Sequence, residues 1–349
     1  MLLSDFDYDL PEELIAQQPL EKRDASRMLI LDRARQAHKD SRFELLSEYI
    51  HPGDVLVVNN TRVFPARLIG QREPSGGRVE VLLSREVEPT LWEALVRPAQ
   101  RLKQGSRVSF GDSGLRAEVL ECSTKGVRLL RFEADGLGTQ QLEALINAQG
   151  QTPLPHYIRR PDGESDEDGE RYQTVFAREK GAIAAPTAGL HFTPEVISDL
   201  RAREVKVVEI TLHVGYGTFE PVRVANVEEH RVAPEFFQID EPAAAVINET
   251  RATGGRVIAV GTTTTRALES SVSDAGLVVA GPGTSELTIT PGYKFRVTDA
   301  LLTNFHLPQS SLLLLVCAFA GRDFTLAAYR HAVAARFRFY SYGDCMFVI

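Results

Sequence analysis

Three of the eight histidines of this chain stand beside glycine or proline at the ends of expected secondary structure elements. They are His191 in "APTAGLHFT", His213 in "TLHVGYGTFEPV" and His306 in "TNFHLPQSS". Histidine titrates near neutral pH, so three histidines converging at one sheet edge would suit proton transfer. Each one taken alone is more often a packed structural residue, and both interpretations stay open at this point.

Polar and glycine-rich junctions elsewhere could bind a ligand. The small residues of 185–193 would let backbone N–H groups approach an anion, and the threonines of "AVGTTTTRALES" could cap a helix or hold ribose and carboxylate oxygens. A surface salt bridge or a simple helix cap is the plainer alternative for these side chains. The candidate binding residues are Asn60, Arg62, Arg67, Thr187, Gly189, Gly215, Thr262, Thr263, Thr264 and Arg266.

Two sequence patterns along the chain predict the secondary structure elements that must position these residues. Strand and helix alternate in 54–60 and again in 192–270, which indicates an α/β fold with a mostly parallel sheet. Ligands of such sheets bind at the strand ends. Helices are expected at 9–18, 41–50, 192–204, 241–255 and 262–272, the third with Thr193 as its cap and Pro194 at its first position.

Between these regions, short β segments follow one another about every ten residues, punctuated by Gly, Pro and Ser. This spacing predicts a small antiparallel β-barrel. We therefore expect a discontinuous α/β domain, residues 1–65 and 152–349, with a β-barrel inserted at 66–151.

The charge of the chain is divided unevenly between these parts. Residues 62–131 carry thirteen Lys or Arg against eight Asp or Glu, a local charge of +5, and the remainder carries 26 against 39, or −13. A basic insert on an acidic body favours contact with phosphate, although a barrel with charged outer faces is an equal alternative. The acidic segment 159–173 is interpreted as a solvated loop or as a lid that orders on substrate.

Composition excludes several classes of protein. At 43% hydrophobic and 25% charged residues, the chain is typical of a soluble globular protein. Its three cysteines form no CxxC, which argues against disulfides and zinc, and we expect no metal. The acidic N-terminus lacks the features of a signal peptide, and the longest apolar run is too short to span a membrane. These features predict a cytoplasmic protein without a membrane partner.

Long motifs in the same order along the whole chain carry a family resemblance. They are "SDFDYDLPEELIAQQPLEKRDASRMLIL", "VNNTRVFPARL", "GAIAAPTAGLHFT", "LHVGYGTFEPV", "VGTTTTRALE", "PGYKFRVTDALLTNFHLP" and "YSYGDCMF". Through them the chain resembles the S-adenosylmethionine:tRNA ribosyltransferase-isomerases of bacterial queuosine biosynthesis. The family has an α/β domain with an inserted β-barrel, which agrees with the two sequence patterns described above.

The resemblance implies that S-adenosylmethionine is a co-substrate that donates its ribosyl group, with no prosthetic group. The acceptor is the aminomethyl group of a 7-deazaguanine at the wobble position of tRNA, and the products are epoxyqueuosine in tRNA, adenine and methionine. This chemistry needs a base at the ribose carbon beside the sulfonium and an acid at the departing adenine. We expect His191 and His213 to transfer protons, with His306 as a third candidate, in an enzyme that acts as a monomer.

The chain departs from the family pattern at three places. Ala233 replaces the second histidine of a usual His-x-Met-His-Ser-Glu stretch, Gln309 replaces an arginine after "NFHLP", and His156 replaces a proline. Two other hypotheses remain: a tRNA-binding relative without activity, and a conventional S-adenosylmethionine methyltransferase. The glycine-rich turn that such a methyltransferase needs after its first strand is absent.

Overall fold

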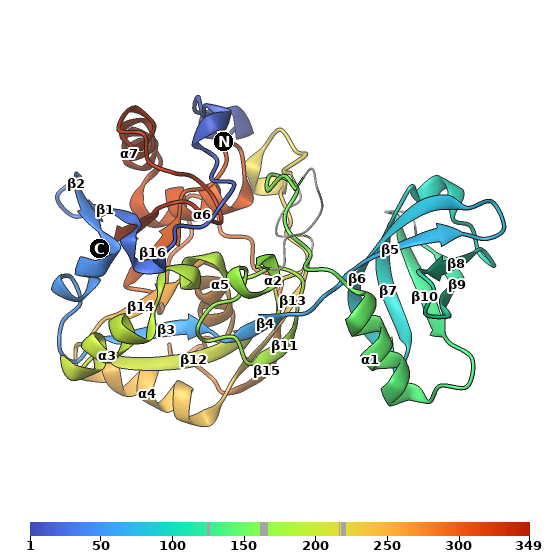
Figure 1. Ribbon diagram of the computed structural model, residues 1–349. Helices are drawn as coiled ribbons and strands as arrows, with labels where there is room; N and C mark the ends of the chain where they lie inside the picture. The colour runs from blue at the N-terminus through green and yellow to red at the C-terminus, as the bar shows by residue number, and fades with distance from the viewer. Residues whose placement is uncertain (124–125, 161–166, 216, 218–220) are drawn as a thin grey trace.

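The computed structural model describes residues 1–123, 126–160, 167–215, 217 and 221–349. Figure 1 shows a large α/β body and a smaller barrel joined to it by a narrow connection. The predicted fold class, an α/β domain with an inserted antiparallel barrel, is confirmed.

A nine-stranded sheet runs through the described part of the body. Its strands, in spatial order, are β15 (Gly281–Ser285), β13 (Glu235–Ile239), β12 (Lys206–Leu212), β3 (Val55–Asn59), β14 (Val257–Val260), β16 (Ala300–Asn304), β17 (Cys345–Val348), β1 (Arg27–Asp32) and β2 (Ala37–Arg42). The four central strands from β12 to β16 pair in parallel, and antiparallel pairs flank them on both sides. The sheet is therefore mixed, with a parallel centre that carries the predicted strands.

Helices cover both faces of this sheet because its strands alternate their side chains. Val55 and Val57 of β3 face one apolar cluster, and Leu56 and Val58 face the other. The first cluster is completed by α4 (Glu241–Ala252), α5 (Thr262–Ser270), α6 (Ser311–Ala320) and α7 (Arg322–Ala334), and the second by α3 (Pro194–Ala202) and the 3-10 helix η4 (Phe43–Glu48). Further short helices are η1 (Leu3–Phe6), η2 (Glu12–Leu14), η3 (Arg23–Ala25), η6 (Thr187–His191), η8 (Val227–Glu229) and α2 (Asp168–Arg171).

Six strands close the inserted barrel in the order β10, β7, β6, β5, β8 and β9. They span β5 (Arg67–Arg72), β6 (Gly77–Glu88), β7 (Leu91–Arg97), β8 (Arg107–Phe110), β9 (Leu115–Cys122) and β10 (Val127–Glu133), with the short helix η5 (Ala99–Arg101) after β7. The helix α1 (Thr139–Gln149) packs Leu142 and Ile146 into the barrel core. The chain then returns to the body beside its point of departure, because Gln151 pairs with Arg67.

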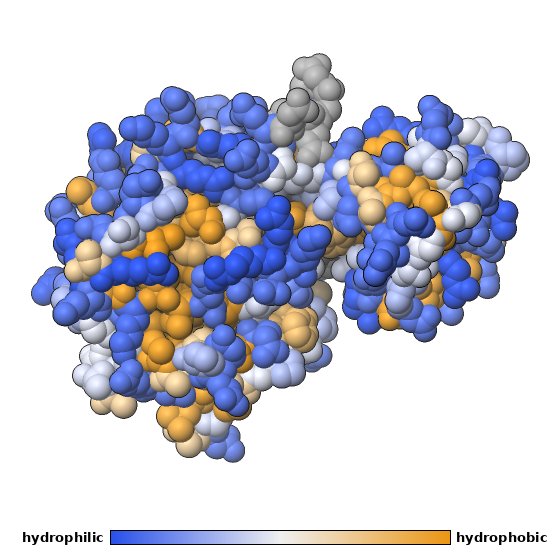
Figure 2. All heavy atoms as spheres, turned by 60° about the horizontal axis from the view of Figure 1, so that its bottom comes forward, coloured by the Kyte–Doolittle hydropathy of each residue, from blue (hydrophilic) through white to orange (hydrophobic). Residues whose placement is uncertain are grey.

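A two-stranded ribbon of β4 (Thr61–Val63) and β11 (Glu179–Ala182) lies where the barrel leaves the body. Figure 2 shows barrel and body as two lobes with a waist between them. Among the described residues, no single helix has the length and apolar character to cross a membrane; α6 and α7 pass that test only as a pair, bent by 115°.

Candidate active site and two adjoining clefts

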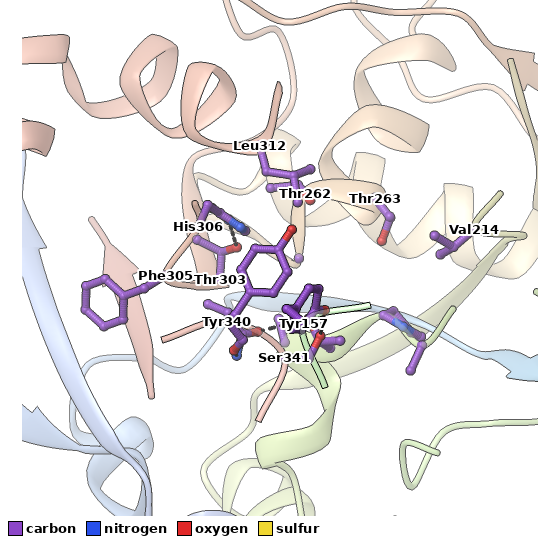
Figure 3. A pocket seen from close by; sticks show the side chains of 16 residues that line it. Tyr157, Val214, Thr262, Thr263, Thr303, Phe305, His306, Leu312, Tyr340 and Ser341 are labelled. Carbon is purple, nitrogen blue, oxygen red and sulfur yellow. Dashed lines mark hydrogen bonds between the residues drawn. The ribbon is translucent and has the colours of Figure 1, made fainter. Parts of the chain in front are cut away.

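An inner cavity lies at the carboxyl ends of the central parallel strands. β14 and β16 are parallel neighbours, so Gly261–Thr263, which follow the first, come close to Asn304–His306, which follow the second. The loop 185–188 and residues 340–341 complete most of the lining. This is the edge at which α/β sheets bind ligands. Figure 3 shows His306 and Thr303, Tyr340 and Tyr157, and Thr262 and Thr263 around this cavity, with Phe305 turned away.

The start of α5 presents an unusual set of threonines to the inner cavity. The hydroxyl groups of Thr264 and Thr265 donate to the carbonyls of Val260 and Gly261, at 2.7 and 3.1 Å, and so are used inside the helix. Thr262 and Thr263 line the cavity instead. Thr263 is 6% exposed, and its Oγ1 has no hydrogen-bond partner among the described residues. A buried hydroxyl at a helix N-terminus, where partial positive charge gathers, is suited to an anionic group.

His306 is the predicted histidine that lines the inner cavity. Its Nε2 lies 2.9 Å from Thr303 Oγ1, and its backbone is held on both sides, since Tyr8 donates to its carbonyl and its own N–H donates to Tyr329 Oη at 3.2 Å. Burial lowers the pKa of His306 to about 3. The ring is therefore neutral at pH 7 and can accept a hydrogen bond at the cavity wall.

His191 does not line the inner cavity but is hydrogen-bonded to Asn304, which does. Asn304 Nδ2 donates to His191 Nε2 at 3.2 Å, and His191 Nδ1 donates to Ser26 Oγ at 2.6 Å. Asn304 itself lines the cavity, and its Oδ1 accepts from Thr187 at 3.3 Å. Burial, aided by the guanidinium groups of Arg338 and Arg23, lowers the pKa of His191 to about 3. A neutral His191 with both ring nitrogens bonded is therefore suited to fixing the Asn304 carboxamide.

His213 occupies a third environment, in a cleft between barrel and body. Its Nδ1 lies 2.8 Å from Thr61 Oγ1, and its ring stacks on Phe236 with centroids 5.7 Å apart. Gly181 makes this position possible, because a Cβ there would lie 2.7 Å from the imidazole ring. Burial lowers the pKa of His213. The three histidines thus lie in three different environments, and only His306 is on the wall of the inner cavity.

Arg266 is engaged in a buried ion pair away from the inner cavity. Its side chain is 7% exposed and pairs with Glu235, while Nε and Nη2 donate to the carbonyls of Leu287 and Ser285 at 3.0 and 3.2 Å. Glu235 also accepts from the backbone N–H of Gly215 at 3.0 Å. This arrangement fixes the Gly215 loop, and it leaves Arg266 buried and pointing at protein atoms.

A basic cleft adjoins the inner cavity at the junction of barrel and body. Arg67 and Arg97 of the barrel and Arg159 and Arg160 of the body line it, with Glu80 as its one lining carboxylate among the described residues. Arg67 Nε donates to Glu80 at 3.0 Å, and Arg160 forms a two-pronged ion pair with Asp168. Arg159 also pairs with Glu12, so the four arginines exceed these three carboxylates by one positive charge, which favours an anion such as phosphate.

Two tyrosines form the wall that the basic cleft shares with the inner cavity. Tyr157 and Tyr340 line both spaces, and their rings meet edge to face with centroids 3.9 Å apart. The Tyr157 hydroxyl lies 2.5 Å from Ser341 Oγ. A substrate in the basic cleft would therefore be separated from one in the inner cavity by the thickness of these rings.

The remaining predicted residues are structural neighbours of these spaces. Asn60 Oδ1 accepts from Thr211 at 2.7 Å, and Gly189 packs tightly against Thr174. Arg62 is exposed on β4. Sequence reasoning did not select Asn304, Ser341, Tyr157 or Tyr340 as site residues. Asn304 lies in the family-like motif "TNFHLP", and Tyr340 and Ser341 lie in "YSYGDCMF".

Part of the predicted lid falls outside the described residues, namely 161–166 of the acidic segment. Its described end is anchored, because Asp168 is buried against Arg160. Within the described ranges, no group of three or more His, Cys, Asp or Glu side chains is arranged to hold a metal ion.

Comparisons with known proteins cover the entire chain. Residues 3–348 match a family model described as queuosine biosynthesis protein. A protein of Acetivibrio thermocellus named S-adenosylmethionine:tRNA ribosyltransferase-isomerase is 49% identical over 348 residues, which is 100% of each chain. A crystal structure of S-adenosylmethionine tRNA ribosyltransferase from Thermotoga maritima aligns over 99% of this chain and 100% of its own, with 38% identity and a TM-score of 0.55.

Proposed function

This chain belongs to the S-adenosylmethionine:tRNA ribosyltransferase-isomerase family of queuosine biosynthesis, and we propose that it acts on the wobble nucleoside of tRNA. It transfers and isomerises the ribosyl group of S-adenosylmethionine onto an aminomethyl-deazaguanine base. The products are epoxyqueuosine in tRNA, adenine and methionine. The observation that carries this proposal is the inner cavity. On one side lies the Thr263 hydroxyl, which has no hydrogen-bond partner in the described part of the chain, and on another lies a wall shared with the basic cleft.

S-adenosylmethionine binds in the inner cavity in this proposal, as a co-substrate. Its methionine carboxylate lies at the start of α5, where the Thr263 hydroxyl and the helix N-terminus supply what an anion needs. Asn304 and Thr187 border the same cavity and are available to ribose hydroxyls. Thr264 and Arg266 support this site without touching the substrate, since their polar atoms are bonded inside the protein.

The tRNA approaches along the basic cleft. Its anticodon phosphates meet Arg67, Arg97 and Arg159, and the modified base reaches the inner cavity past Tyr157 and Tyr340. Contacts of this kind fix the position of the nucleic acid, while the cavity selects the base.

Proton transfer is assigned by position and charge. His306 borders the cavity and is, by its position, our first candidate to accept the proton from the ribose carbon; its lowered pKa does not support this role. His191 positions Asn304. His213, whose ring lies in the cleft between barrel and body, is a further candidate for proton transfer. The departing adenine needs a proton donor, for which the hydroxyls at Tyr157, Tyr340 and Ser341 are candidates. We expect a monomer that acts in the cytoplasm.

A product assay tests the proposed function against its two alternatives. Purified protein is incubated with S-adenosylmethionine and tRNA that carries the aminomethyl-deazaguanine, and the small-molecule products are separated by chromatography. Release of adenine and methionine in equal amounts is expected. S-adenosylhomocysteine would instead indicate a methyltransferase, and tRNA binding without either product would indicate an inactive relative.

A further inference from the structure

A second cleft between barrel and body is separate from the inner cavity, and His213 lies on its wall. It lies beside the β4–β11 ribbon, and aromatic rings from both lobes line it: Phe64, Trp92, His213 and Phe236. Phe64 and Trp92 form one pair with centroids 5.5 Å apart, and His213 and Phe236 form another at 5.7 Å with only 22° between their planes. We refer to this space as the aromatic cleft.

Two of these rings are poorly explained by packing alone. Phe236 lies on β13 with 45% of its surface exposed, although it is one of the larger apolar side chains of the protein. Trp92 Nε1 is shielded from solvent and has no hydrogen-bond partner among the described residues. Buried indole N–H groups usually find an acceptor, so this donor faces an incomplete environment. A flat ligand seated in the cleft would cover the exposed ring of Phe236.

Basic side chains stand next to these rings on the ribbon. Lys180 lines the aromatic cleft, and its register partner on β4 is Arg62, so the two side chains lie on the same face of the ribbon. Both are exposed. The cleft is also lined by the exposed Arg85, which pairs with Glu93, and by the carboxylates of Glu86, Glu143 and Glu235, so its lining as a whole is not basic. Stacking would therefore supply most of the affinity there, with a phosphate held outside at the ribbon.

We propose that the aromatic cleft binds an unpaired nucleobase of the anticodon loop, other than the base that is modified. Aromatic platforms flanked by positive charge are how proteins hold single-stranded nucleic acid. The inference rests on the proposed function, because it takes tRNA as the substrate. It adds a second base-binding position, in a cleft that shares no lining residue with the basic cleft, by which the enzyme holds a splayed loop.

Trp92 provides a direct probe, since it is the only tryptophan of the chain. The wild-type protein is titrated with a dye-labelled anticodon stem-loop, and anisotropy reports binding while Trp92 emission reports stacking. Saturable quenching of Trp92, with the same dissociation constant as the anisotropy change, is expected. The variant Phe236→Ala should weaken binding roughly 5- to 150-fold, the range for loss of one base–aromatic stack. The control Leu277→Ala removes another exposed apolar side chain, 52% exposed and outside both clefts, and should bind as wild type.

The outcomes separate this inference from the proposed function. Suppose that the stem-loop binds tightly and adenine is released normally, but Trp92 emission does not change and Phe236→Ala binds as tightly as the wild type. This result would overturn the inference and leave the proposed function standing. Equal quenching by a fully paired RNA duplex would also overturn it, because no unpaired base would then be needed. Absence of both stem-loop binding and adenine release would refute the two proposals together.

Discussion

Buried neutral histidines make the stability of this protein depend on pH. His191 and His306 each have a pKa of about 3 because burial disfavours the imidazolium. In the unfolded chain the same groups titrate near 6.5. The unfolded state therefore binds more protons between these values, and the stabilisation present above pH 6.5 is lost as the pH falls toward 3.

We predict that acidification from pH 7 to pH 5 lowers the free energy of unfolding by roughly 2 kcal/mol for each of these two histidines. Urea titrations across this range measure the loss. Most carboxylates remain ionised in this window, so the histidines dominate the slope. The double variant His191→Gln, His306→Gln should flatten the curve, whereas His51→Gln, at an exposed site, should leave it unchanged. A wild-type slope in the double variant would contradict the assignment.

The second prediction at the residue scale concerns Arg266. Arg266→Ala should destabilise the protein by about 3–5 kcal/mol, because it leaves Glu235 buried without its charged partner. The control Arg67→Ala removes a half-exposed partner of Glu80 and should cost about 0–1 kcal/mol. Urea unfolding of both variants measures the difference. If Arg266→Ala unfolds like the wild type and only loses affinity for S-adenosylmethionine, the arginine is a ligand of the substrate.

At the scale of elements, local signals predicted α3 and α4, whose first turns are each capped by a side chain. In α3, Thr193 accepts from the backbone of Val196 and Pro194 occupies the first turn, as its sequence indicates. The helices expected at 9–18 and 41–50 form only the 3-10 turns η2 and η4. Tertiary hydrogen bonds explain the first difference, since Ala16 bonds to Phe339 and continues no helix.

The residues of the site, too, could be predicted where local sequence determines their position and could not where distant contacts do. Threonines at a strand-to-helix junction marked the cavity, because chain direction alone brings such a junction to the sheet edge. The partners of His191 and Arg266 could not be predicted, since Ser26, Asn304 and Glu235 are distant in sequence and meet only in the packed core. The helix α1 was missed although Leu142, Leu145 and Ile146 have helical spacing, because it lies within a region of β texture.

A prediction about α5 tests its role at the cavity. Thr263→Val keeps the shape of the side chain and removes a hydroxyl that has no partner in the described structure. Its stability should therefore match or exceed that of the wild type. If the hydroxyl binds the methionine carboxylate, KM for S-adenosylmethionine should rise roughly 10- to 150-fold, the range for a hydrogen bond to a charged group. Thermal unfolding and steady-state kinetics measure the two effects.

The matched control for this variant lies on the same helix. Thr265→Val removes a hydroxyl that donates to Gly261 and does not line the cavity. It should lose some stability and keep its KM. Equal KM changes in the two variants would show that the effect arises from the helix as a whole, and would exclude Thr263 as the carboxylate ligand.

At the scale of the whole molecule, charge is separated between the two lobes. The excess of +5 over residues 62–131 belongs to the barrel and its connection, and the body is acidic. Arg97, Arg101 and Lys103 are exposed on the barrel, and Arg97 also lines the basic cleft. Binding of a polyanion to this lobe releases counterions, so its affinity must fall with increasing salt in proportion to the number of phosphates contacted.

We predict that the triple variant Arg97→Ala, Arg101→Ala, Lys103→Ala binds tRNA more weakly and with a shallower salt dependence. Each lost phosphate contact lowers the slope of log K against log salt by about 0.7–0.9, so the slope should decrease by roughly 2 if all three side chains reach phosphates. The control neutralises Arg35, Lys39 and Arg42, which surround β2 at the far edge of the body sheet. If both triple variants change the slope of log K against log salt equally, tRNA affinity depends only on the total charge of the protein, and the barrel is not the lobe that docks tRNA.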